Sequence, residues 1–506
     1  MRRTYSLKVC PLCATRYFSD DRLCSTDESN SISKLSDDVL LEIFDLYRKD
    51  HYNNPRPLPV WKWHILVHVC QRWRQLVFSS PSRLNLHIHC TYGTAVRKDL
   101  CIWPAFPIVL DLYIAIHLTP DDEDNAIAAL ENSDRMHSVM LYLAGPQLAN
   151  MAMVMSKPFP LLTSLKIHSI VGNDPVLPGE FLRGPAPRLQ ELYLHSIPFL
   201  ALPTLLLSAN NLITLVLSMI PRTGYIPPEA MVVCLSALPR LKTLLIDFQS
   251  KTLHPDPDGT CPPHATRNVL PALSSFTFRG VSEYLEDLVA QIDAPELERI
   301  SVVYWNQPHN VRPTHLSDFI NRSVGPELTP SRRAHVIFHL GRVAFTLYRR
   351  ANYSGCDQRR VEVSVSMEKA NGHTPDLTQV LGDFSAILRT VVHLELELHL
   401  DDNYQLEIIL WHNLDWPYLF RQFPAMQILD VSGCLARYMA AALNYITTEM
   451  AAKMFPSIHL IFIEGQPPSS VETIVAARRL SGRPVTVVQS KAELENLLKS
   501  YMTLSE

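Results

Sequence analysis

Histidines recur along this 506-residue chain at spacings that could bind a metal ion or transfer a proton. His64 and His68 stand four positions apart, as do His335 and His339. Zinc peptidases combine such a pair with a glutamate directly after the first histidine, where it acts as the general base. Both pairs here carry an apolar residue at that position, so we interpret all four as packed or surface histidines.

Two groups of carboxylates have equally simple structural explanations. The acidic run Asp121–Asp124 directly precedes an apolar helical pattern, where negative charge stabilises a helix N-terminus. Glu395 and Glu397 alternate with leucines, so both lie on one face of a predicted strand. They could form an acid–base pair, but an exposed strand face produces the same pattern.

The cysteines do not complete a metal site. Cys10, Cys13 and Cys24 offer three soft ligands, and the fourth ligand of a structural zinc site is missing. We therefore predict no metal and no cofactor, and a flexible tail over residues 1–30. The ten cysteines are scattered, a pattern typical of a reducing compartment rather than of a disulfide framework.

Composition excludes several classes of function. The chain has only 16 glycines, too widely spaced for the glycine-rich turn that binds dinucleotides or the G-x-S-x-G turn of hydrolases. The net charge of −4 provides no basic field for nucleic acid. Neither a secretion signal nor an apolar run of about 18 residues is present, so no membrane contact is predicted. We expect a soluble cytoplasmic or nuclear binding protein, not an enzyme.

Two amphipathic helices are predicted between residues 31 and 82. Ser36 is a natural N-cap, and the run that follows to Phe44 places apolar residues at helical spacing. A second helical pattern spans Trp61–Phe78 and ends before Pro81. So small a unit cannot bury both apolar faces, and we expect one face to dock on a partner. A helical hairpin that caps the rest of the chain is the alternative.

These residues carry a resemblance to a known family. Leu35-Ser-Asp-Asp-Val-Leu-Leu-Glu-Ile-Phe44, followed by Val69-Cys-Gln-Arg-Trp-Arg-Gln-Leu-Val77 and Ser80-Pro81, resembles an F-box. The match covers about Ile32–Pro81. It departs from the family at Ser36, where proline is usual, in the longer loop between the helices, and at Arg83-Leu84, where Leu-Trp often closes the motif.

A short pattern that begins with proline returns along the remainder of the chain. It reads Pro-x-Φ-x-x-Φ-x-Φ, where Φ is apolar, and clear copies begin at Pro187, Pro239, Pro271, Pro295 and Pro424. Each unit of strand and helix can bury its apolar faces only against its neighbours, so the units must stack. An ordinary α/β domain with leucine-rich strands is the alternative.

Helices are expected between these strands, over Glu229–Leu238, Ser282–Ile292, Leu316–Val324, Leu377–Leu388 and Ala436–Lys453. Residues 331–367 alternate instead as longer paired strands, which indicates an insert that widens the sheet. The expected fold class is α/β: a small helical F-box-like module over residues 31–82, a curved leucine-rich-repeat-like α/β solenoid over 83–480, and a C-terminal cap over 481–506. This combination resembles the F-box proteins with degenerate leucine-rich repeats that are numerous in mushroom-forming fungi.

The resemblance implies a substrate receptor of a Skp–cullin–F-box ubiquitin ligase. The helices would dock on the Skp-type adaptor, and through it on the cullin, while the repeats would bind an unknown target protein. A repeat scaffold without a ubiquitin role is the alternative, and the Ser36 departure keeps it open. An enzyme with an unrecognised site is disfavoured by the composition.

Two sets of residues follow from this interpretation. The expected adaptor contacts are the apolar positions of the two predicted helices: Leu35, Val39, Leu40, Ile43, Phe44, Val69, Trp73 and Leu76. The expected target contacts are outward positions of the predicted strands: Tyr193, His195, Asp247, Arg279, Glu395 and Glu397. Basic and aromatic residues dominate the early strands and carboxylates the late ones, which predicts a gradient of charge along the face.

Overall fold

The computed structural model describes residues 31–49, 63–80, 83–84, 86–102, 106–113, 118–170, 176–183, 186–249, 267–305, 314–324, 333–339, 342–348, 362–368, 384, 388–399, 415–432, 435–436, 439, 447–464, 469–480, 482–494 and 496–497. The chain divides into two compact units. Unit 1 comprises residues 1–165 and 181–184, and unit 2 comprises residues 166–180 and 185–506. The predicted tail over residues 1–30, with its three cysteines, lies outside the described residues.

Unit 1 combines short N-terminal helices with three parallel strands. Its elements are η1 (Ser31–Lys34), α2 (Asp37–Lys49), α3 (Trp63–Val67), α4 (Gln71–Ser79), β1 (Ile88–Cys90), α5 (Val96–Ile102), β2 (Ile108–Leu112), α6 (Pro120–Leu130), β3 (Met136–Leu143) and α7 (Gly145–Val154). Strand β2 pairs in parallel with β1 and with β3. The predicted role of Asp121–Asp124 is confirmed: the run lies in the first turns of α6, where the Thr119 side chain accepts a hydrogen bond from the Asp122 N–H.

The second predicted helix, Trp61–Phe78, is wrong in its continuity. The chain turns at His68 and Val69, and α4 begins only at Gln71. The Sγ atom of Cys70 accepts a hydrogen bond from the N–H of Trp73, so a cysteine serves as the N-cap of α4. Hydrophobic spacing alone carried no sign of this break, because the apolar positions keep nearly the same phase across it.

Unit 2 is built from strands that follow one another with helices between them. Its strands are β5 (Glu191–His195), β6 (Thr214–Ile220), β7 (Thr243–Phe248), β8 (Asn268–Val269), β9 (Ser275–Gly280), β10 (Ile292–Asp293), β11 (Arg299–Trp305), β12 (Arg333–His339), β13 (Arg342–Tyr348), β14 (Glu362–Glu368), β15 (His393–Leu398), β16 (Ile428–Val431), β17 (Leu460–Ile463) and β18 (Thr486–Val488). Strand β4 (Ser164–Ser169) contains the boundary between the units. The helical elements are α8 (Leu202–Ser208), η2 (Arg222–Gly224), α9 (Pro228–Ser236), α10 (Ser282–Ala290), α11 (Thr314–Val324), α15 (Trp416–Arg421), α17 (Thr448–Met454) and α18 (Ser469–Leu480).

The main sheet of unit 2 runs in the order β5-β6-β7-β9-β11-β14-β13-β12-β15-β16-β17-β18. Most neighbours are parallel, whereas β13 is antiparallel to both β12 and β14. The predicted insert is therefore confirmed as paired strands inside the sheet. The chain enters it at β12, next to β15, and returns through β14 to pair with β11. Strands β8 and β10 pair separately.

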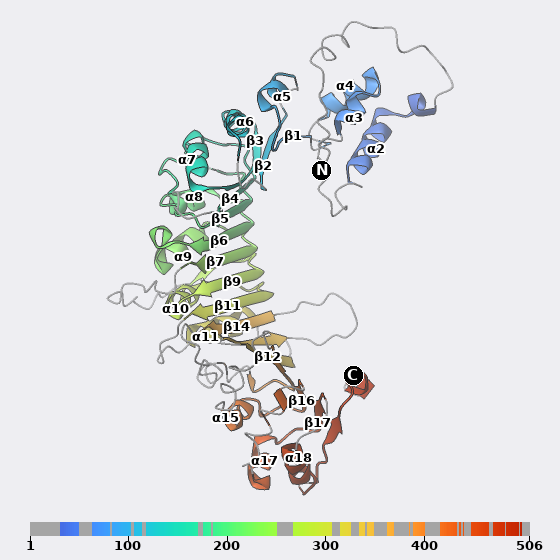
Figure 1. Ribbon diagram of the computed structural model, residues 1–506, viewed down its shortest axis with the longest axis vertical. Helices are drawn as coiled ribbons and strands as arrows, with labels where there is room; N and C mark the ends of the chain where they lie inside the picture. Colours follow the sequence, from blue (N-terminus) through green and yellow to red (C-terminus); the bar gives the residue numbers. More distant parts are fainter. Residues whose placement is uncertain are drawn as a thin grey trace. The chain divides into compact units, whose positions relative to one another are not determined.

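Along most described strands of unit 2, residues alternate between a buried face and a half-buried face. In β5 and β6 the buried residues are leucines and Ile220. Helices α8–α11 lie on one side of the sheet (Figure 1), and Leu194 and Leu217 line a cavity together with Leu202 of α8 and Met231 of α9, so the buried face is the helix side. We call the other face, made by the half-buried positions, the open face. Side chains also join successive helical units: Arg240 donates to the side chain of Asn211, and Arg322 to that of Asp293, each across 29 residues. These side-chain contacts thus connect each pair of strand and helix to the next one along the chain.

The α/β fold class with a largely parallel sheet is confirmed. The first apolar residue of each copy, such as Leu189, Leu241 and Leu273, is buried and stands two residues before its strand begins. Helices α9, α10 and α11 match the predicted ranges within two residues. Most of the predicted helix over 377–388 lies outside the described residues, as does the middle of the one over 436–453. The segment predicted as a C-terminal cap, residues 481–506, contains strand β18, which pairs with β17 and extends the sheet.

Candidate functional site

The helices of unit 1 pack around one aromatic pair. Leu40 and Phe44 of α2 are buried, and the Phe44 ring contacts the edge of Trp73 at a centroid distance of 4.6 Å. Arg72 of α4 donates to Asp37 Oδ1 at 2.7 Å and to the backbone oxygen of Leu35 at 2.6 Å. These contacts fix the N-terminal end of α2 against α4.

A second apolar face of α2 stays exposed. Val39, Ile43 and Leu46 follow one another at helical spacing, and Leu46 is 57% exposed. Val69, in the turn before α4, is 55% exposed, and Ile65 of α3 is exposed as well. Apolar side chains that lie together on a surface mark a contact for another molecule more often than single exposed ones.

The structure divides the predicted adaptor set into buried and exposed positions. Leu40, Phe44 and Leu76 are buried in unit 1, where they support the packing of the helices. Leu35 and Trp73 are half-buried. The sequence pattern did not separate the two faces, because apolar residues occupy more of the circumference of α2 than one buried stripe requires.

Polar side chains gather on the open face at strands β4 and β5. Lys166 forms an ion pair with Glu191 at 2.9 Å, and its Nζ lies 4.6 Å from the centre of the Tyr193 ring. Beside them, the rings of His168 and His195 are stacked at a centroid distance of 3.8 Å and an interplanar angle of 5°. Burial and the neighbouring imidazole lower the pKa of His168 to about 4, and burial also lowers the pKa of His195. Both rings are therefore neutral at neutral pH, which is what allows them to stack.

The next strands add a carboxylate to this patch. Asp247 accepts hydrogen bonds from Ser218 Oγ at 3.1 Å and from the N–H of Met219 at 3.4 Å, and burial raises its pKa. Arg279 is its register partner on β9. Met219 has a φ of 52°, a left-handed conformation that costs a non-glycine residue about 1 kcal/mol. In this conformation its N–H donates to the Asp247 carboxylate.

A second polar group lies across β12, β15 and β16. Arg333 forms an ion pair with Glu395, and His335 Nε2 lies 2.9 Å from Glu397 Oε2. Asp430 of β16 is the register partner of Glu395. This group therefore holds three carboxylates together with cationic and imidazole side chains.

The structure brings the six predicted target residues into two places, not one. Tyr193, His195, Asp247 and Arg279 lie on β5, β7 and β9, whereas Glu395 and Glu397 lie on β15, beyond the inserted strands. The predicted gradient of charge is wrong, because Glu191 lies among the early cations and Arg333 among the late carboxylates. Sequence reasoning missed Ser218, Arg333 and His393, since their roles depend on pairings between strands 29 to 62 residues apart.

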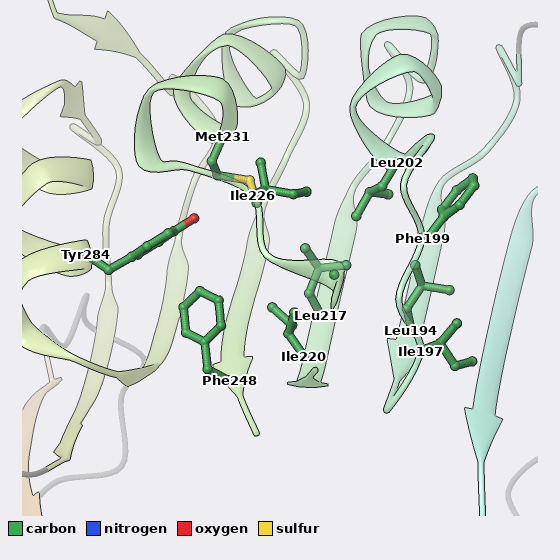
Figure 2. Close-up of a pocket in the computed structure, with 11 residues that line it drawn as sticks. Leu194, Ile197, Phe199, Leu202, Leu217, Ile220, Ile226, Met231, Phe248 and Tyr284 are labelled. Carbon is green, nitrogen blue, oxygen red and sulfur yellow. The ribbon is translucent and has the colours of Figure 1, made fainter. Parts of the chain in front are cut away.

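Two hollows are found among the described residues of unit 2, and neither polar group lines them. An interior cavity of about 20 Å³, room for one water molecule, lies between strands and helices of unit 2 and is lined by apolar side chains (Figure 2). The buried Tyr284 hydroxyl borders it and has no hydrogen-bond partner among the described residues. A larger hollow of about 380 Å³ lies between α18 and β18 and contains none of these polar groups.

The described residues also show neither a metal site nor a membrane helix. Among them, no three His, Cys, Asp or Glu side chains are grouped so that they could hold a metal ion. In the described part of the chain, no helix is both long and apolar enough to cross a bilayer.

Comparisons with known proteins add little to this geometry. No family model matches the sequence, and no curated protein matches it. Nine chains of solved structures match, among them InlP from Listeria monocytogenes, at 13% identity over 47% of this chain and 90% of that chain, with a TM-score of 0.15. That similarity is too low to bear on fold or function.

Proposed function

We propose that this chain is the target-binding subunit of a Skp–cullin–F-box ubiquitin ligase, in which the N-terminal helices bind a Skp-type adaptor. The observation that carries the proposal is the second apolar face of α2, where Val39, Ile43 and Leu46 are exposed beside a buried aromatic pair. An F-box needs such a helix with one face for its own core and another for the adaptor. The resemblance between about Ile32 and Pro81 supports the same assignment.

The strands of unit 2 are proposed to form a leucine-rich-repeat-like solenoid whose open face binds the target. Successive parallel strands, helices on one side and side-chain bonds across 29 residues support this assignment. The chain itself would perform no covalent step. It would raise the concentration of the target near a ubiquitin-conjugating enzyme held elsewhere in the assembly, which accelerates transfer by proximity.

The test is direct binding of a purified Skp-type adaptor to the full chain by calorimetry. The double variant Ile43→Lys with Leu46→Lys places two charges in the exposed face and should weaken binding about 100-fold, as expected for the loss of two central apolar contacts. Both positions are exposed, so the helices should remain folded, and circular dichroism checks this.

The matched control is Leu207→Lys with Val233→Lys. These residues are also exposed apolar positions on helices, α8 and α9 of unit 2. This control should bind the adaptor normally. Undiminished binding by the α2 double variant, or equal loss in the control, would refute the assignment of this face.

A scaffold without a ubiquitin role is the second candidate, and Ser36 in place of the usual proline favours it. However, Ser36 Oγ accepts a hydrogen bond from the N–H of Val39 at 3.4 Å, so the helix start is preserved without proline. Failure of the unaltered chain to bind the adaptor would support the scaffold.

A further inference from the structure

The open face of unit 2 contains one group of titratable side chains whose charges do not cancel. We call it the β15 cluster, and it comprises Arg333, His335, His393, Glu395, Glu397 and Asp430. Arg333 neutralises Glu395, and Glu397 lies 2.9 Å from His335 and 3.3 Å from His399. With Asp430 ionised, the cluster holds three carboxylates against one permanent cation.

Asp430 is the carboxylate left over. It stands directly across from Glu395 on the neighbouring strand, an arrangement of like charges that destabilises a sheet. No described cation is in ion-pair contact with it, although Lys491, which follows β18, acts on it at longer range. Burial and the negative charges of Glu395 and Glu397 raise the pKa of Asp430 to about 7, against the opposing effect of Arg333 and Lys491. A second cation close to Asp430 would relieve this repulsion.

A histidine in the same cluster points independently to a missing partner. His393 is only 7% exposed, and its Nε2 has no hydrogen-bond partner among the described residues. It precedes Glu395 by two positions, so it lies on the same face, and its pKa is lowered to about 4 by burial and then by Arg333. A neutral imidazole presents one donor and one acceptor nitrogen, and buried polar atoms of this kind are almost always bonded.

Extended chain fits the spacing of these groups. Glu395 and Glu397 lie two residues apart on one strand, about 7 Å along its axis. A peptide in extended conformation presents alternate side chains at the same interval. An ammonium or guanidinium group offers several donors, enough to reach a carboxylate and an acceptor nitrogen at once.

We propose that the β15 cluster binds a lysine or arginine side chain of an extended segment of the target. This inference rests on the proposed function only in calling the bound segment a target; the cluster would bind such a segment whether or not the adaptor binds. The bound cation favours the ionised form of Asp430, so binding releases a proton. Affinity should rise as pH increases, because deprotonation of Asp430 prepares the site.

The size of this effect follows from the pKa of Asp430. With a pKa of about 7, the carboxylate is about one-tenth ionised at pH 6 and about nine-tenths ionised at pH 8. A ligand that binds only the ionised form therefore gains about tenfold in affinity between these values. A variant at Asp430 tests whether this carboxylate causes the rise in affinity with pH.

The probe is a fluorescein-labelled octapeptide of alternating lysine and alanine, compared with the same peptide carrying acetyl-lysine. Fluorescence anisotropy with the full chain at pH 6, 7 and 8, at constant ionic strength, should show at least tenfold tighter binding of the lysine peptide at pH 8 and the tenfold rise with pH. Asp430→Asn should weaken binding at pH 8 and flatten most of the rise. Glu472→Gln, which removes an exposed carboxylate on α18, should change neither.

Equal binding of the acetylated peptide would overturn the proposal, and this comparison on the unaltered chain needs no variant to fold. Equal weakening by Glu472→Gln would also overturn it, since that result indicates general attraction to negative charge. Adaptor binding measured on the same preparation separates the two proposals. An adaptor-binding chain that ignores the peptide refutes only the β15 cluster, and a peptide-binding chain that ignores the adaptor refutes only the ligase role.

Discussion

Glu286 connects two successive helices of unit 2. It can be used to test how strongly each pair of strand and helix depends on the next pair along the chain. It lies on α10 and is 7% exposed. Its carboxylate accepts hydrogen bonds from the N–H of His315 at 2.7 Å and from the N–H of Leu316 at 3.2 Å. These two groups belong to the first turn of α11, where no partner exists within the helix. A side chain of α10 thus caps the N-terminus of the next helix, α11.

These contacts set the loss of stability expected when the cap is removed. Glu286→Ala leaves two backbone donors without an acceptor in a buried place, each worth about 1–3 kcal/mol. It also removes a negative charge from the positive end of the helix dipole, worth about 0.5 kcal/mol. Since water can reach part of the space, we expect a loss of about 3 kcal/mol. Glu286→Gln keeps one acceptor oxygen and should cost about half as much.

Hydrogen exchange read by mass spectrometry is the suitable assay, because it reports each segment of the full chain. A loss of about 3 kcal/mol corresponds to about 150-fold faster exchange for amides of α11 that open by local unfolding. The control is Glu298→Ala, an exposed carboxylate before β11, which should leave α11 unchanged. If the amides of α11 exchange at the same rate in Glu286→Ala as in the unaltered chain, the coupling between α10 and α11 is refuted.

Three further outcomes are expected. Gly280→Ala should destabilise unit 2 by about 1–3 kcal/mol in chemical unfolding, because a Cβ there would lie 2.8 Å from Phe248 Cδ2, while Gly179→Ala, with open space around it, should be neutral. Phe44→Ala should lower stability by about 3–5 kcal/mol and expose the amides of α2 and α4 to exchange, whereas exposed Val39→Ala should change it by less than about 0.5 kcal/mol. The melting temperature should fall as the pH drops from about 6.5 towards 4, because burial lowers the folded-state pKa of His89 to about 4 and the folded chain therefore binds fewer protons than the unfolded one in this range. His89→Gln should make this dependence shallower, and an unchanged slope would contradict the assignment.

Much of the repeating fold was predictable, because the apolar residues that define the short sequence pattern are also the residues that pack in the core. The first leucine of each proline pattern is buried against the neighbouring elements, so Leu189, Leu241 and Leu273 could be placed in the core from spacing alone. The N-terminal helices were less predictable. The break before α4 depends on a cap by Cys70, a residue type rarely used for this purpose, and the two apolar faces of α2 differ only in what packs on them.

The candidate sites were predictable only in part, for a different physical reason. Alternation along a strand indicates which side chains leave the core, and it selected Tyr193, Asp247 and Glu395 correctly as members of the open face. It does not indicate which strand lies next to which. The stacked rings of His168 and His195, or the bond from Ser218 to Asp247, require the register between strands.

The inserted strands show how far strand order decides the chemistry of the open face. Because β14 and not β12 pairs with β11, the strand beside β15 is β12. Following the registers across the insert aligns Ser301 of β11 with His335 of β12. Without the insert, β11 would be the neighbour of β15, and a serine would stand where an imidazole now bonds to Glu397. The insert thus adds Arg333, which pairs with Glu395, and His335, which contacts Glu397, so that Asp430 is left as the carboxylate that can exchange its proton for a cation.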